Sequence, residues 1–116
     1  MDSAIYNKTY KFALRIINAY KYLTDEQREF ILSKQLLRSG TSIGAMCREA
    51  EHAQSKADFL NKMNIALKEA NETEYWLQLL HDSDYIDDTV YKSIIKDCSD
   101  ILKLLISIVR TTKERI

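Results

Sequence analysis

The sequence predicts an all-α chain that folds as an antiparallel up-and-down four-helix bundle, and three observations lead to this class. Proline is absent and only two of the 116 residues are glycine, so helix breakers are almost missing. Apolar residues recur at intervals of three and four in four successive stretches. Short connections between these stretches make neighbouring helices antiparallel. The length suits one core, so we expect a single domain over residues 1–116.

The first helix is expected over residues 3–22. One broad apolar stripe runs along it, formed by Tyr6, Tyr10, Ala13, Ile17 and Tyr20 together with Phe12, Ile16 and Leu23 beside them. Thr24 and Gln27 have the spacing of a capping box, in which each side chain can satisfy an otherwise unpaired backbone amide of the other residue. The second helix is therefore expected to begin at Thr24.

The second helix contains both glycines. Residues 39–42 resemble a turn locally, but the apolar spacing continues through them, so we expect one helix to about residue 52. Gly40 and Gly44 share one face, and each costs about 1 kcal/mol relative to Ala inside a helix. Close packing of a neighbouring backbone, or of a large side chain such as Trp76 or a tyrosine, would compensate. A kink at the glycines is the alternative.

The last two helices have clear start signals. Ser55 can cap a helix that extends to about residue 82, and Asp87 or Asp88 can cap the final one. The third helix has an apolar stripe of Phe59, Met63, Ala66, Ala70, Thr73, Leu77 and Leu80. The corresponding stripe of the fourth comprises Tyr91, Ile94, Cys98, Ile101, Leu105 and Ile108.

The charge balance limits the choice of partner. Lys and Arg together number 17, as do Asp and Glu, so no global basic field indicates a nucleic-acid partner. Neither a signal pattern nor a run of roughly 18 apolar residues is present, and we expect a cytoplasmic protein without membrane contact. Cys47 and Cys98 have no metal-type spacing, so we expect two buried, reduced thiols, with a disulfide or redox role as the alternative.

Two polar groups were considered as metal or catalytic sites. Glu49 and His52 have the Glu-x-x-His spacing found in di-metal bundles, but His81 is preceded at that offset by Gln78, so half of the signature is missing. No metal and no cofactor are expected. The second group, of helix-flank carboxylates, has no nucleophile, histidine partner or phosphate-binding loop, so we expect these side chains to be solvated or paired and the protein not to be an enzyme. Its members are Glu69, Glu72 and Glu74.

A basic row on the second helix is the candidate nucleic-acid site. Lys34, Arg38 and Arg48 share one face, opposite the apolar stripe of the same helix. Cationic side chains held on a rigid helix are suited to phosphate contacts, each of which would add salt dependence to binding. A solvated face or salt bridges between helices would explain the same residues.

Several segments resemble the family of four-helix bundle proteins encoded in intervening sequences of bacterial 23S rRNA genes. The resemblance covers nearly the whole chain, and Met46-Cys47 departs from a more common Asn-aliphatic pair. The matching segments are QLLRSGTSIGA at 35–45, REA at 48–50, DF at 58–59, IALKEA at 65–70 and ETEYWL at 72–77, together with Tyr91, Ile101 and KLL at 103–105.

This resemblance implies an up-and-down bundle that assembles into a ring-like homopentamer of unassigned biochemical role. The related accessory variability determinant of diversity-generating retroelements binds nucleic acid and its reverse transcriptase through basic surfaces, which favours the row of Lys34, Arg38 and Arg48. The zero net charge argues against strong binding. A ring would also give the two glycines and the aromatic residues a role at a subunit interface.

Two hypotheses follow. The first is a non-enzymatic oligomeric scaffold that binds RNA or DNA, such as ribosomal RNA or a ribonucleoprotein, through the basic face of the second helix. The alternative is a protein-interaction scaffold with no nucleic-acid role.

Overall fold

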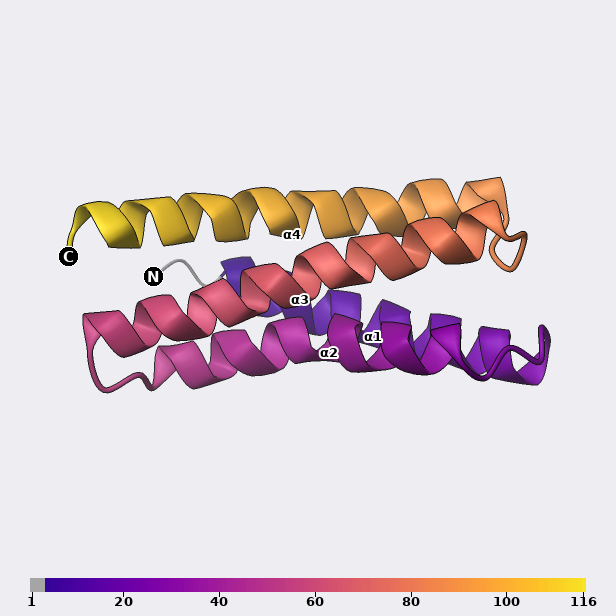
Figure 1. Cartoon of the computed structure of the whole chain (residues 1–116), viewed down its shortest axis with the longest axis horizontal. Coiled ribbons are helices and arrows are strands. Elements are labelled where there is room, and N and C mark those ends of the chain that lie inside the picture. Colours follow the sequence, from indigo (N-terminus) through magenta and orange to yellow (C-terminus); the bar gives the residue numbers. More distant parts are fainter. Residues whose placement is uncertain (1–3) are drawn as a thin grey trace.

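The computed structural model describes residues 4–116, which form four α-helices in the predicted up-and-down order (Figure 1). Residue 3, where the first helix was expected to begin, lies outside this range. The helices are α1 (Ala4–Asp25), α2 (Leu32–Glu51), α3 (Lys56–Asp82) and α4 (Asp88–Glu114). Each helix packs against the next, and α4 returns to α1, where the contact is smallest. The bundle measures 46 × 20 × 19 Å.

The connection between α1 and α2 differs from the prediction. The first helix continues to Asp25, and the second begins only at Leu32, so the capping box at Thr24 and Gln27 is wrong. The Thr24 hydroxyl donates to the carbonyl of Tyr20, 2.9 Å away, and the Gln27 amide donates to the Tyr22 hydroxyl. Both side chains therefore contact the helix behind them. Arg28 then adopts a left-handed conformation with φ of 55°, which separates the two helices.

Glu29 supplies the cap that the sequence analysis assigned to Thr24. Its carboxylate accepts hydrogen bonds from the backbone amides of Ile31, Leu32 and Ser33, the last at 2.7 Å. These amides have no partner within the helix, and a negative charge is favourable at the positive end of the helix dipole. Burial opposes ionisation of Glu29, but the hydrogen bonds outweigh it and lower the pKa of the carboxyl below its ordinary value.

The core-facing side of α1 is only one edge of the broad stripe that was predicted. The residues at its centre are Ile5, Thr9, Phe12, Ile16 and Leu23, all of which are buried, and the last three belong to that stripe. The other edge of the stripe turns away from the core: Tyr10 is 56% exposed, and Tyr6, Ala13, Ile17 and Tyr20 are only partly buried. The helix thus has two adjacent apolar stripes, and the one with Phe12 and Ile16 fits against α2 and α4.

The glycines of α2 lie against α1. A Cβ atom at Gly40 would stand 2.7 Å from Cγ1 and 2.8 Å from Cγ2 of Ile16, and one at Gly44 would stand 3.3 Å from the Thr9 hydroxyl oxygen and 3.4 Å from its backbone carbonyl oxygen. The predicted continuous helix is confirmed, since α2 passes through both positions without interruption. The contacts at the glycines come from Ile16 and Thr9 rather than from Trp76 or a tyrosine.

The other helix pairs follow the predicted pattern. Ser55 caps α3 by accepting from the Asp58 amide at 3.0 Å, and Asp87 caps α4 by accepting from the Val90 amide at 2.8 Å, which confirms both start signals. One buried polar contact was not predicted: the Thr73 hydroxyl of α3 lies 2.9 Å from the Ser39 hydroxyl of α2. This hydrogen bond fixes how the two helices face each other.

We expect Gly40→Ala to destabilise the bundle. The new methyl group would press on the γ carbons of buried Ile16, and overpacking of this kind costs roughly 1–3 kcal/mol, which exceeds the gain of about 1 kcal/mol in helix propensity. Gly44→Ala is the matched control, because its methyl group would meet Thr9 at 3.3–3.4 Å, a milder crowding that the same propensity gain should roughly offset. Urea unfolding measures both, and equal stabilities of the two variants would contradict this account of the α1–α2 contact.

We expect Glu29→Gln to lower stability at neutral pH by about 1 kcal/mol, because a charged acceptor of three amide hydrogen bonds is replaced by a neutral one. The native pKa of Glu29 is depressed, so its contribution is complete above the ordinary value of 4.5 and disappears as the pH falls through the lower native value. Thermal unfolding from pH 7 to pH 3 should show the two proteins converging in acid. Glu26→Gln, an exposed change in the same connection, should shift neither curve.

Candidate nucleic-acid interface

The predicted basic row lies on the exposed side of α2. Lys34, Arg38 and Arg48 are all exposed, and the helix positions them by a regular backbone whose opposite side buries Leu36 and Ile43. The row is therefore on the surface, as a phosphate contact requires. The three side chains differ in their surroundings.

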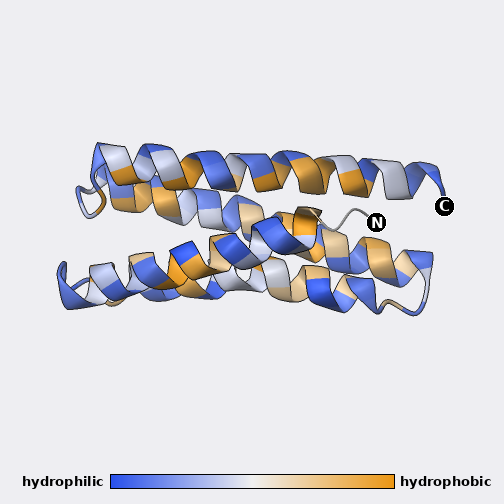
Figure 2. Ribbon diagram, turned by 180° about the vertical axis from the view of Figure 1, so that it is seen from behind, coloured by the Kyte–Doolittle hydropathy of each residue, from blue (hydrophilic) through white to orange (hydrophobic). Residues whose placement is uncertain are grey.

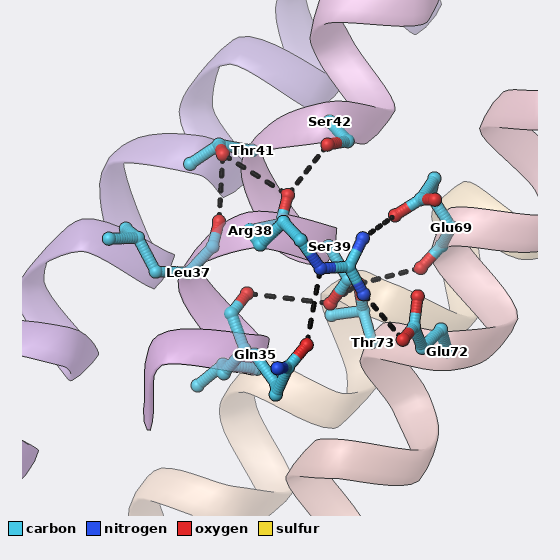
Figure 3. A network of polar contacts seen from close by, with 10 residues as sticks. Gln35, Leu37, Arg38, Ser39, Thr41, Ser42, Glu69, Glu72 and Thr73 are labelled. Carbon is cyan, nitrogen blue, oxygen red and sulfur yellow. Dashed lines mark hydrogen bonds and ion pairs between the residues drawn. The ribbon is translucent and has the colours of Figure 1, made fainter. Parts of the chain in front are cut away.

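Arg38 is paired with α3. Its guanidinium contacts the carboxylates of Glu69, at 3.1 Å, and Glu72, and its Nε donates to Gln35 (Figure 3). The hydrogen bond from Arg38 lowers the pKa of Glu72 and keeps this carboxyl ionised. The predicted pairing of these helix-flank carboxylates is thus confirmed for Glu69 and Glu72. Two carboxylates offset the one guanidinium, which makes Arg38 a poor phosphate ligand in this conformation.

Lys34 and Arg48 have no hydrogen-bond or ion-pair partner among residues 4–116. Arg48 is part of a shallow pocket of about 210 Å³ between α1 and α2, which is mostly apolar. The pocket is lined by Tyr6, Thr9, Tyr10, Ala13, Thr41, Gly44, Ala45 and Arg48. Arg48 consequently borders an apolar surface, whereas Lys34 is exposed and does not line this pocket.

The Glu-x-x-His pair does not gather into a metal site. Glu49 forms an ion pair with Lys62 at 3.6 Å, while His52 is exposed at the end of α2. His81 lies at the end of α3, where its ring stacks on Tyr91 with centroids 4.0 Å apart and contacts Asp88 at 2.6 Å. The described residues contain no cluster of three potential metal ligands.

The remaining reactive groups are held in unreactive settings. Burial is the main cause that raises the pKa of Tyr91 and of Cys98. Glu74 faces α4 near both groups, and its negative charge raises their pKa further. Cys47 and Cys98 are free and buried, and burial raises their pKa to about 11 and about 12. Protonated buried thiols are poor nucleophiles and poor metal ligands.

A second cationic group, which was not predicted, lies between α1 and α4. Arg15 joins the helices through an ion pair with Asp97 at 2.6 Å and a hydrogen bond to the Ser93 hydroxyl at 3.0 Å. Its signal in the sequence is the helical spacing of Lys8, Lys11 and Arg15. The partners on α4 are about 80 residues away in the sequence, so spacing within α1 does not reveal the group as a whole.

Three comparisons place the chain among known proteins. A family model described as "23S rRNA-intervening sequence protein" matches residues 1–107. Among solved structures, the chain is similar to a protein of unknown function from the S23 ribosomal protein family of Bacteroides thetaiotaomicron VPI-5482. The two are 63% identical, the match covers 90% of this chain and 97% of the other, and the TM-score is 0.90. No curated protein matches.

None of the helices formed by residues 4–116 has the length and apolar character needed to cross a bilayer.

We expect Arg38→Ala to lower the free energy of unfolding by up to about 1 kcal/mol, because an exposed pair contributes little and this one joins two helices through two carboxylates. Arg48→Ala removes an exposed arginine from the same helix without breaking an ion pair and should have no effect. A double-mutant cycle with Glu72→Gln isolates the pair. Additive effects in that cycle would show that Arg38 and Glu72 are not coupled.

Proposed function

The chain belongs to the family of 23S rRNA-intervening sequence proteins, and from this premise we propose that it is a non-enzymatic scaffold that assembles with copies of itself and binds RNA or DNA on the assembled surface. The family description refers to ribosomal RNA, and neither it nor the description of the similar structure names an enzymatic activity. The observation that carries the proposal is a pair of apolar surfaces on opposite sides of the bundle.

The first surface, called here the α1–α2 face, is the outward-turned stripe of α1 together with the adjoining side of α2. Tyr10 and Leu14 are 56% and 46% exposed, and orange segments recur along α1 in Figure 2. The face also includes small residues that leave room for a partner's side chains. Its members are Tyr6, Tyr10, Ala13, Leu14, Ile17, Leu37, Thr41 and Ala45.

The second surface, the α3–α4 face, lies on the other side of the bundle. Helical spacing places its residues just outside two contacts that mark where α3 meets α4, the buried contact of Ala70 with Cys98 and the stacking of His81 on Tyr91. Ile106 is 43% exposed, and the other three members are only partly buried. The members are Leu60, Leu67, Ile95 and Ile106.

Two different apolar faces on opposite sides favour head-to-tail assembly. Contact of the α1–α2 face of one copy with the α3–α4 face of the next repeats around an axis, and such an assembly closes into a ring when the rotation allows it. Covering one large apolar side chain contributes about 1.5–3 kcal/mol, so a few residues on each face are enough to drive association. The ring of five implied by the resemblance is the subunit count we propose.

The nucleic-acid part of the proposal rests on exposed cations that a ring would repeat around its axis. Repetition raises avidity, because several weak contacts then act on one nucleic-acid molecule. A protein-interaction scaffold is the competing function, and the zero net charge of the chain favours it.

We expect the wild-type chain to have a native mass that is a multiple of 13.5 kDa, with five copies as the proposed number. Tyr10→Glu disables one face and Ile106→Glu the other, so each variant alone should lose the large assembly. A mixture of the two should give heterodimers, because each variant retains one intact face and the two intact faces are complementary. Native mass spectrometry at micromolar concentration reports all three results.

Val90→Glu is the matched control, since Val90 is 46% exposed but lies on α4 toward α1, outside both faces. It should assemble like the wild type. A monomeric wild-type chain, or an assembly that tolerates both face variants, would contradict the scaffold. Titration of the wild type with a structured RNA over a range of salt tests the second part, and retention of a protein partner without any RNA or DNA affinity would favour the alternative.

A further inference from the structure

We propose that the surface between α1 and α4 is where this protein contacts the phosphate backbone of nucleic acid. This inference rests on the proposed function and assigns its nucleic-acid site. The surface, called here the α1–α4 face, is defined by Lys8, Lys11, Arg15, Lys96, Asp97, Asp100 and Lys103.

Positive charge is concentrated on this side of a neutral chain. The described helix α1 carries four cations against one carboxylate, Asp25, and three of the four, Lys8, Lys11 and Arg15, belong to this face. On the α1–α4 face, five cations stand against two carboxylates, which leaves a net charge of +3. The surplus is local, because the whole chain sums to zero.

The contacts within the face leave most of its lysines available. Arg15 is bound to Asp97 at 2.6 Å, and Lys96 to Asp100 at 3.1 Å. Lys8, Lys11 and Lys103 are exposed and have no hydrogen-bond or ion-pair partner in the described part of the chain.

The cations belong to one continuous site that both helices build. A groove of about 140 Å³ between the helices is lined by Lys8, Lys11, Phe12, Asp97, Asp100 and Ile101. Asp100 is one of the two carboxylates that line it: the hydrogen bond from Lys96 lowers its pKa, and the charges of Lys8 and Lys103 lower it further. Three lysines from two helices therefore act on Asp100, while Asp97 is paired with Arg15, so the cations of the face outnumber its carboxylates and favour a further anion.

The arrangement fits a phosphate backbone better than it fits bases. Lys8, Lys11 and Arg15 extend over about 10 Å of helix, and a nucleic-acid strand presents one phosphate per roughly 3.4 Å of its axis, so a few phosphates can face this row. Phe12 lines the groove but is buried at 1% exposure, and none of the residues that define the face is aromatic, so the face offers no platform on which bases could stack. Binding should therefore depend on salt and little on sequence.

The α1–α4 face is also the cationic surface that assembly would leave open. Arg48 borders the α1–α2 face, which the next copy covers in the proposed ring, and Arg38 is neutralised by α3, which leaves Lys34 as a lone exposed cation of the row. The α1–α4 face lies between the two assembling faces and would be displayed once by every subunit.

The test compares variants of the full chain that carry equal changes in charge. Lys8→Gln, Lys11→Gln and Lys103→Gln are combined in the test variant. Lys21→Gln, Lys56→Gln and Lys68→Gln are combined in the control, since these lysines are exposed and lie elsewhere. A third protein carries Lys34→Gln and Arg48→Gln. Fluorescence anisotropy with an RNA hairpin, and with a DNA hairpin of the same sequence, is recorded over a range of KCl, and native mass confirms that each protein assembles like the wild type.

We expect the test variant to bind at least about tenfold more weakly than the wild type, with a salt slope smaller by about 2–3, and the control to stay within about twofold. If the affinities for RNA and DNA fall alike, the site contacts the phosphate backbone that both share. If only the affinity for RNA falls, the 2′-hydroxyl also takes part in the contact at this site. Equal losses in the test and control variants, or a loss confined to the Lys34 and Arg48 protein, would overturn the assignment while leaving the proposed function intact. A wild-type protein that binds neither hairpin would overturn both.

Discussion

The close packing of α1 on α2 is the constraint on which the rest of the structure depends. There is no room for a side chain at position 40 between α2 and Ile16. The side of α1 that carries Ile16 therefore packs on α2, and rotation of α1 would remove Ile16 from this contact. That orientation fixes the directions of the other two sides of α1. Tyr10 and Leu14 point outward beside α2, and Lys8, Lys11 and Arg15 line the border with α4.

The same packing explains why one chain has more apolar surface than its core uses. A helix with a single apolar stripe can bury it completely in the core of its own bundle. Helix α1 has two stripes and buries only the one that fits beside the glycines. An uncovered stripe of this length exposes the chain to association, and natural monomers rarely carry large exposed apolar patches. The proposed assembly through opposite faces would use this surface and leave the charged sides of the bundle in water.

The sequence predicted the positions of the helices well, but it predicted less well which side of each helix faces the core. Periodicity located the four helices and most of the core, and the caps at Ser55 and Asp87 located the last two connections, because these signals are local. The cap at Thr24 was wrong because Glu29, five residues later, offered a charged acceptor to three amides, and only the path of the chain after Arg28 brings it there. The shape of α2 decides which of the two apolar stripes of α1 is buried, and the sequence of α1 alone gives no information about that shape.

The candidate site shows the same division between local and tertiary information. Spacing alone placed Lys34, Arg38 and Arg48 on one exposed face, but their availability depends on α3, whose carboxylates pair with Arg38. The lysines of the α1–α4 face are far apart in the sequence, and Lys103 belongs to a half of the chain that is acidic in sum. Net charge averages over all directions, whereas a polyanion meets one side of the molecule. A neutral bundle can therefore present a cationic surface, provided that its helices separate the charges, and here the orientation of α1 separates them.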